Sequence, residues 1–199
     1  MGVALLGAYH ALSDLPAQTA FIRFLALSAF FLLSVSLMIG PLAVFKSSFA
    51  PLIEPRRAVG IAAFVFAALH FLLVASLYFG FDFGQMVSMF PLAIAMLALV
   101  VLLILALTAT DLAVAKMGFA KWKTLQRFVY PAYILIFAHF ILKANGLFSR
   151  DGKPVALNAA EVALVLLGVA AVALQVAAFF EFRKRKAAPV HDKENNDSP

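Results

Sequence analysis

Long uncharged runs are the feature that most restricts how this chain can fold. Residues 24 to 45 contain no Asp, Glu, Lys or Arg, and residues 58 to 81 are equally free of them and carry His70. The hydrocarbon core of a bilayer is about 30 Å thick and a helix rises about 1.5 Å per residue, so about 20 such residues cross it. Both runs therefore predict transmembrane helices.

Three further segments have the character of membrane spans. Residues 89 to 110 and 162 to 180 are long and mostly apolar. Residues 128 to 142 form a shorter run, so the charged groups of Arg127 and Lys143 must reach toward the two interfaces. Because 64% of the chain is apolar and only 13% is charged, we predict an all-α membrane protein. Its fold class is a bundle of five transmembrane helices, or six if the opening segment also spans.

The remaining segments give one membrane domain with two short ends. Residues 1 to 20 have neither the basic start of a signal peptide nor the length of a span, which favours a separate interfacial or frayed segment. Residues 21 to 182 form the membrane domain, and residues 183 to 199 form a basic, polar tail that we expect to be disordered. Lys and Arg are concentrated in this tail and in the loops after the first and third spans. The positive-inside rule then places the C terminus in the cytoplasm.

Composition also excludes several classes of function. The chain has no cysteine, which excludes disulfides, iron–sulfur clusters and thiol chemistry. The net charge of +6 follows from membrane topology, so we expect the lipid bilayer and no nucleic acid as a partner. Carboxylates occur only at the ends of the spans, which leaves little for ion or proton coupling.

Two of the four histidines, His70 and His139, lie inside spans. They follow Arg57 and Arg127 by 13 and 12 residues, which places both about 18 to 20 Å from the inner boundary, in the outer half of the bilayer. An ionisable group at that depth indicates a function, although each histidine can also stay neutral and bond to a neighbouring helix. Two imidazoles at one level can bind one metal centre.

The surroundings of the two histidines indicate what kind of centre this is. A bare zinc or copper ion would recruit more ligands, and no Cys, Asp or Glu lies within a turn of either histidine. Phe71 and Phe140 follow them directly, and apolar walls suit a b-type haem with two axial imidazoles. With 21 Phe in the chain, however, any histidine would have such neighbours. Lys143 is a candidate contact for a haem propionate, or a simple interfacial anchor.

Three short motifs follow one another along the chain. They are "EPRRAVGIAAFVFAALHF" at 54 to 71, "LALTAT" at 105 to 110 and "WKTLQRFVYPAYILIFAHF" at 122 to 140. Their order and spacing resemble the ferric-reductase-like transmembrane domain family, in particular the haem-binding membrane subunits of periplasmic methionine-sulfoxide reductase systems. The resemblance covers about residues 24 to 180 and implies that His70 and His139 are haem ligands.

The resemblance also carries one departure. The family usually has a histidine where this chain has Gln126, and an amide oxygen is a poor haem ligand. One haem b is therefore the expectation. The resemblance implies a bacterial inner membrane protein that receives electrons from a cytoplasmic flavin reductase or a quinol, and it leaves room for flavin or quinone as a further cofactor. The acceptor would be a periplasmic reductase.

We expect an electron-transfer subunit and not a complete enzyme, because the chain has no nucleotide-binding motif and no catalytic residue that we can name. Two alternatives stay open. The chain could be a non-redox scaffold or assembly factor in which both histidines are structural, or it could itself be a haem-dependent ferric or quinone reductase. No internal repeat is evident in the sequence.

Overall fold

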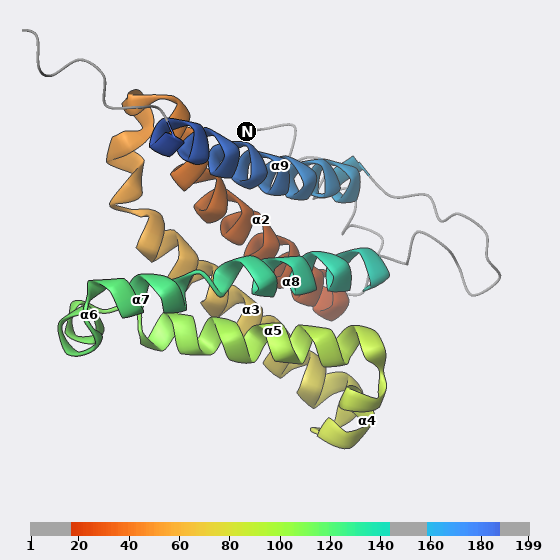
Figure 1. Ribbon diagram of the computed structural model, residues 1–199. Coiled ribbons are helices and arrows are strands. Elements are labelled where there is room, and N and C mark those ends of the chain that lie inside the picture. Colours follow the sequence, from red (N-terminus) through yellow and green to blue (C-terminus); the bar gives the residue numbers. More distant parts are fainter. Residues whose placement is uncertain (1–16, 144–158, 188–199) are drawn as a thin grey trace, which may run out of the picture.

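Figure 1 shows the computed structural model, which describes residues 17–143 and 159–187. These residues form helices joined by short turns, with no strand among them. The elements are α2 (Ala17–Phe45), η1 (Ser47–Ile53), α3 (Arg56–Phe79), α4 (Phe83–Ser88), α5 (Phe90–Leu107), α6 (Asp111–Met117), α7 (Phe119–Gln126), α8 (Val129–Lys143) and α9 (Ala159–Ala187).

Five helical stretches of the described chain are long and apolar enough to cross a membrane. They are Ala17–Phe45, Arg56–Phe79, Phe90–Leu107, Phe119–Leu142 and Ala159–Arg185. The predicted all-α membrane bundle of five spans is therefore confirmed. The chain is an integral membrane protein.

The fourth span is longer than predicted and is broken. It consists of α7 and α8, separated by a turn at Arg127 and Phe128. Pro131 lies in the first turn of α8 and has no backbone N–H, so it cannot donate to the carbonyl of Arg127 as a continuous helix would require. The N–H of Tyr130 bonds to that carbonyl instead, at 3.1 Å. Pro131 therefore explains why the helix restarts at this point.

Both predicted ends of the membrane domain need correction. Residues 17 to 20 belong to α2 and not to a separate segment, because no helix-breaking residue lies between Ala17 and the apolar run. The helix α9 continues to Ala187, into the predicted disordered tail, and an ion pair of 3.0 Å between Arg185 and Glu181 supports its last turns. Residues 1–16 and 188–199 lie outside the described residues, so those predictions stay untested.

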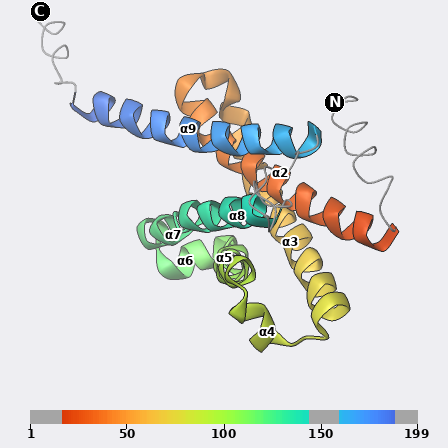
Figure 2. The same ribbon diagram turned by 90° about the vertical axis from the view of Figure 1, so that its right-hand side faces the viewer.

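Helix α2 is the centre of the packing. Half of its most apolar stretch is buried, compared with 11 to 22% in the other four spans. It packs against α3 on one side and α9 on another, while α5 packs against α8, and α3 also contacts α5. Figure 2 shows α9 and α5 on opposite sides of the layer formed by α2 and α8. The four helices α2, α3, α5 and α8 surround the site described below.

Helix α9 is attached to α2 by a specific hydrogen bond. Pro41 lies inside α2 and has no N–H to donate to the carbonyl of Leu37. The side-chain Nε2 of Gln175 on α9 donates to that carbonyl at 2.6 Å. In a membrane a freed backbone carbonyl must find another partner within the protein, so Gln175 fixes where α9 crosses α2.

A glycine allows α9 to come close at a second point. A Cβ atom on Gly168 would lie 2.7 Å from Cε2 of Phe137 and 3.0 Å from Cζ of Phe30. Only a residue without a side chain leaves room for both rings. The Phe30 ring also stacks on Phe140, with centroids 4.9 Å apart, so the contact with α9 continues toward the interior.

Candidate functional site

One cavity of about 230 Å³ is lined by both predicted histidines. His70 is on α3 and His139 is on α8, and these two helices have α2 and α5 as their main neighbours. The cavity lies at the end of the bundle where α2 and α5 begin and α3 and α8 finish, which we name the histidine end. In Figure 1 this end is on the right. The structure thus brings together the two residues that the sequence selected.

Each imidazole is held by a backbone carbonyl of a neighbouring helix. Nδ1 of His70 lies 3.1 Å from the oxygen of Ile22 on α2, and Nδ1 of His139 lies 2.7 Å from the oxygen of Pro91 on α5. A carbonyl can only accept, so Nδ1 carries the proton in both rings and donates it. That tautomer has its lone pair on Nε2, which is the form that binds a metal. The backbone therefore selects the ligating form of both histidines.

The two contacts repeat at a fixed distance along the chain. Each histidine lies 48 residues after the carbonyl that it contacts. From Ile22 to Pro91 and from His70 to His139 the separation is the same, 69 residues. The unit formed by α2 and α3 therefore matches the unit formed by α5 and α8.

The walls of the cavity follow the same repeat. Several pairs of lining residues are also 69 positions apart: Ala26 and Ala95, Leu27 and Met96, Phe30 and Leu99, Leu33 and Leu102, Ala67 and Ile136, and Phe71 and Phe140. This internal repeat was not predicted from the sequence, because only three of these six pairs are identical and all of the residues belong to common apolar types. The histidines with their following phenylalanines were the signal that could have revealed it.

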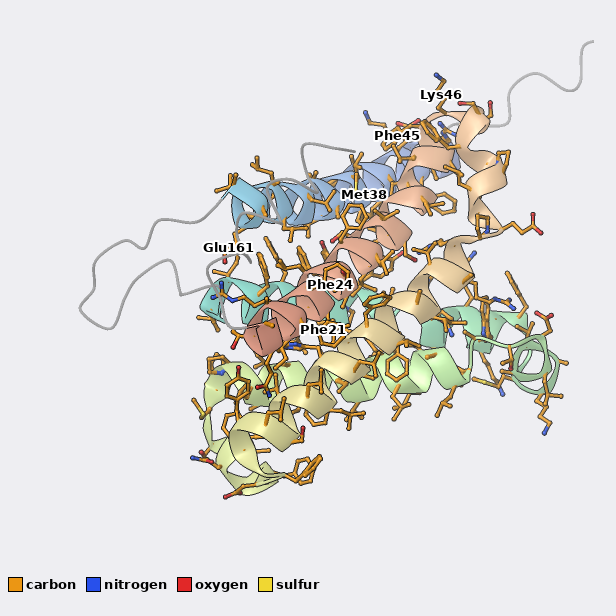
Figure 3. The ribbon with its side chains drawn as sticks, turned by 180° about the vertical axis from the view of Figure 1, so that it is seen from behind. Phe21, Phe24, Met38, Phe45, Lys46 and Glu161 are labelled. Carbon is orange, nitrogen blue, oxygen red and sulfur yellow. The ribbon has the colours of Figure 1, made fainter. Side chains whose placement is uncertain are left out.

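Two charged residues line the cavity that the sequence analysis had not selected. Arg23 comes from the first turns of α2, and its counterpart in the other unit is the apolar Leu92. Glu161 comes from the start of α9 and is buried. Figure 3 shows Glu161 at the beginning of α9, on the side of the molecule where α2 carries Phe21 and Phe24. In the sequence both residues resemble ordinary charges at a helix end, which is why they were missed.

Arg23 has no carboxylate within ion-pair distance in the part of the chain that the structure describes, and this includes Glu161. Within the described residues, no carboxylate competes for this guanidinium with a negative group inside the cavity. Lys143, the predicted propionate contact, is the last residue of α8, but its side chain lies outside the described residues. Its role stays a prediction.

Gln126 is at the opposite end of the bundle from the cavity. Its Nε2 lies 3.3 Å from the carbonyl of Leu105 and 3.3 Å from Oγ1 of Thr108, both at the end of α5. The indole N–H of Trp122 donates to the carbonyl of Thr108 at 2.9 Å. The structure therefore separates Gln126 from His139 and uses its amide to hold α7 against α5.

The donor set of the cavity fits a haem better than a bare metal ion. Within residues 17–143 and 159–187, no three side chains of His, Cys, Asp or Glu converge as a metal cluster would require. The cavity supplies two imidazoles, each fixed through Nδ1, within walls of Ala, Leu, Met and Phe. Such a lining fits a flat macrocycle held by imidazoles better than it fits a bare ion.

A family model described as "Ferric reductase like transmembrane component" matches residues 19–137. The chain belongs to this family. The match contains His70 and stops two residues before His139, so the pairing of the two histidines depends on the cavity itself. The ferric-reductase-like assignment confirms the resemblance found in the sequence.

Several curated proteins are similar to this chain over part of its length. The magnetosome protein MamZ of Magnetospirillum gryphiswaldense is 35% identical over 147 residues, which cover 72% of this chain and 22% of MamZ. The protein-methionine-sulfoxide reductase heme-binding subunit MsrQ of Caulobacter vibrioides is 35% identical over 119 residues, 58% of this chain and 55% of the relative. MsrQ of Brucella ovis is 31% identical over 166 residues, 81% of this chain and 72% of the relative. The chain thus spans about a fifth of MamZ and about half of the Caulobacter MsrQ.

Proposed function

We propose that this chain is an integral membrane b-type haem protein that transfers electrons, in which His70 and His139 would hold one haem. The observation that carries the proposal is that both imidazoles line one cavity while a backbone carbonyl holds Nδ1 of each. The relatives described as heme-binding subunits of a methionine-sulfoxide reductase support the same cofactor. The haem supplies reversible one-electron chemistry at its iron.

The residues of this chain would have three tasks toward that group. The carbonyls of Ile22 and Pro91 fix the tautomer and direction of the imidazoles, which limits reorganisation when the charge of the site changes. The apolar walls exclude water, which influences the redox potential. The buried contacts of Phe30 and Phe140, whose rings stack at 4.9 Å, keep the wall rigid.

We further propose a single haem. The end of the bundle that carries Gln126 is closed by the hydrogen bonds of Gln126 and Trp122 to the end of α5. The residue that matches Gln126 in the other unit is Arg57, which pairs with Asp111 at 2.7 Å. Neither side chain is a good haem ligand, so among the described residues no pair of histidines is available there for a second haem.

The direction of transfer is part of the same proposal. Basic residues gather at the end opposite the cavity, which supports a cytoplasmic C terminus in a bacterial inner membrane and a haem in the outer half. Electrons would come from a cytoplasmic flavin reductase or a membrane quinol and leave to a periplasmic reductase. The MsrQ relatives, which are described as subunits of a protein-methionine-sulfoxide reductase, support an acceptor that reduces methionine sulfoxide.

One observation favours a second candidate, a non-redox scaffold. A hydrogen bond from Nδ1 to a backbone carbonyl is also what a purely structural histidine makes in a membrane. In that case both histidines would link helices, and the protein would fold without a cofactor.

A spectroscopic experiment distinguishes the two. The protein is purified from haem-replete cells into nanodiscs, and its haem content and its oxidised and dithionite-reduced spectra are measured. The proposal expects one haem per chain with a bis-imidazole spectrum, lost in His70→Ala and in His139→Ala and kept in the matched control Gln126→Ala. Well-folded, colourless wild-type protein would establish the scaffold and contradict the haem proposal.

The donor is tested on the same samples. A reduced quinol analogue and a flavin reductase with its nicotinamide substrate are each added to the oxidised protein, and the rate of haem reduction is followed. Reduction by one of them identifies the donor class, and no reduction by either would contradict the proposed donors.

A further inference from the structure

The two units line the cavity with similar apolar residues, but they do not contribute the same charge to its wall. The repeat of 69 residues places an apolar residue opposite another apolar residue at most matched positions of the wall. At the position of Arg23 and Leu92, however, one unit supplies a guanidinium and the other an apolar side chain, which is only 8% exposed. At this matched position the two units therefore differ in charge.

A haem carries its own asymmetry, because both propionates extend from one edge of the ring. Placing these carboxylates against apolar residues is costly unless a cation pairs with them. A guanidinium is well suited, because its N–H groups form two parallel bonds to a carboxylate. Arg23 lines the cavity and has no ion pair with a described carboxylate.

We propose that Arg23 binds the haem propionates and thereby sets the orientation of the haem between two nearly equivalent units. This inference rests on the proposed function, since it concerns how the same cavity holds the haem. Arg23 acts here as a binding and orienting residue, while the histidines hold the iron.

Two other charged residues bear on this assignment. Glu161 lines the same cavity and is buried, so a propionate near it would be repelled without a cation between them. Lys143 matches Val74, which also lines the cavity. Lys143 is therefore the competing candidate, and the experiment compares it directly with Arg23.

The experiment measures haem orientation and haem retention in the purified holoprotein. Haem methyl resonances of the oxidised protein are recorded by NMR, because two orientations give two sets of signals. Haem loss is followed as the rate of transfer to excess apomyoglobin. The variants are Arg23→Leu, Arg23→Lys and Lys143→Gln, with Arg56→Gln at the opposite end of the bundle as the matched control.

Wild-type protein is expected to show one dominant set of signals. Arg23→Leu, which makes this position apolar in both units, is expected to show two sets and to lose haem roughly tenfold faster, the effect of one charge-assisted bond. Arg23→Lys keeps the charge and should retain one dominant set. Arg56→Gln and Lys143→Gln should behave like the wild type.

Several results would overturn the inference while leaving the proposed function intact. One is an Arg23→Leu protein that keeps one orientation and the wild-type rate of haem loss, and another is the Arg23→Leu effect appearing in Lys143→Gln instead. If Arg23→Leu does not fold, the wild-type protein is reconstituted with haem dimethyl ester. The propionates of this haem are blocked as esters, so they cannot form an ion pair with Arg23. Two sets of haem methyl signals from this ester-reconstituted protein would support the inference, and a single set would contradict it. A wild-type protein without haem would instead mean that the proposed function has failed.

Discussion

Two helix pairs, α2 with α3 and α5 with α8, each present one histidine to the cavity. In each pair the first helix supplies the carbonyl that fixes the imidazole of the second. They differ in that α2 carries Arg23 and is covered by α9, while α5 carries Leu92 at the matching position. The shared features position the two histidines, and the differences concern the charge of the cavity wall and the cover by α9. The predictions below test this division.

Removing either histidine should have the largest effect, and the two effects should be equal. His70→Ala and His139→Ala each remove one of two ligands that the repeat makes equivalent, so both are expected to abolish stable haem binding. Haem per chain after purification is the measurement. Full haem content in only one of the two variants would show that the units are not equivalent.

Gly168→Ala tests the packing of α9 on α2 and α8. The added Cβ would lie 2.7 Å from Cε2 of Phe137, so α9 or the ring must move. We expect the free energy of unfolding to fall by about 1 to 3 kcal/mol, as for other overpacked contacts. Thermal unfolding in detergent measures this. The control is Gly60→Ala, whose Cβ would meet only Oγ of Ser36 at 3.4 Å and should cost much less.

Gln175→Leu tests the second attachment of α9. It leaves the carbonyl of Leu37 without the donor that replaces the missing N–H of Pro41, and we expect a loss of about 1 kcal/mol. The double variant with Pro41→Ala restores a backbone donor in α2. Stability of the two single variants and the double variant forms a cycle, and strictly additive losses would show that Gln175 does not serve this carbonyl.

Tyr133→Phe makes α8 resemble its counterpart α3, where the matching residue is Phe64. Tyr133 lies 2.8 Å from Oγ of Ser34, and that hydroxyl already donates to the carbonyl of Phe30 at 2.7 Å. Only one of two bonds is lost, so we expect a loss of about 0.5 kcal/mol. Tyr130→Phe on the exposed face of α8 is the control for thermal unfolding. A loss similar to that of Gly168→Ala would mean that this bond is a main connection between the units.

Asp111→Ala should have the smallest effect. Its ion pair with Arg57 is 2.7 Å long, but the Asp111 side chain is 96% exposed, and exposed pairs contribute little. We expect no measurable change in Tm. Arg57→Ala should be more damaging, since this guanidinium also lies over the Trp122 ring at 5.7 Å. Equal losses in both variants would contradict this ranking.

Sequence patterns predicted the bundle and selected the two histidines, because depth in a membrane can be counted in residues. The pattern failed at the fourth span, where the break at Pro131 and the polar helix α7 hide a longer element. It also failed for Arg23 and Glu161, whose contact with the cavity depends on how α2 and α9 are placed. A charge at a helix end has no sequence signature that separates a site residue from an interfacial one.

The sequence by itself determined that this chain spans a membrane as helices, since uncharged runs of this length have no other way to satisfy their backbone in lipid. It also determined which residues can bind a metal centre, because the apolar runs contain so few polar side chains. Only the tertiary structure decided that the two histidines share one cavity, which tautomer each adopts and that Arg23 joins them. Those features depend on contacts between helices. Residues 69 positions apart occupy matching places around the cavity only because their helices pack in the same way.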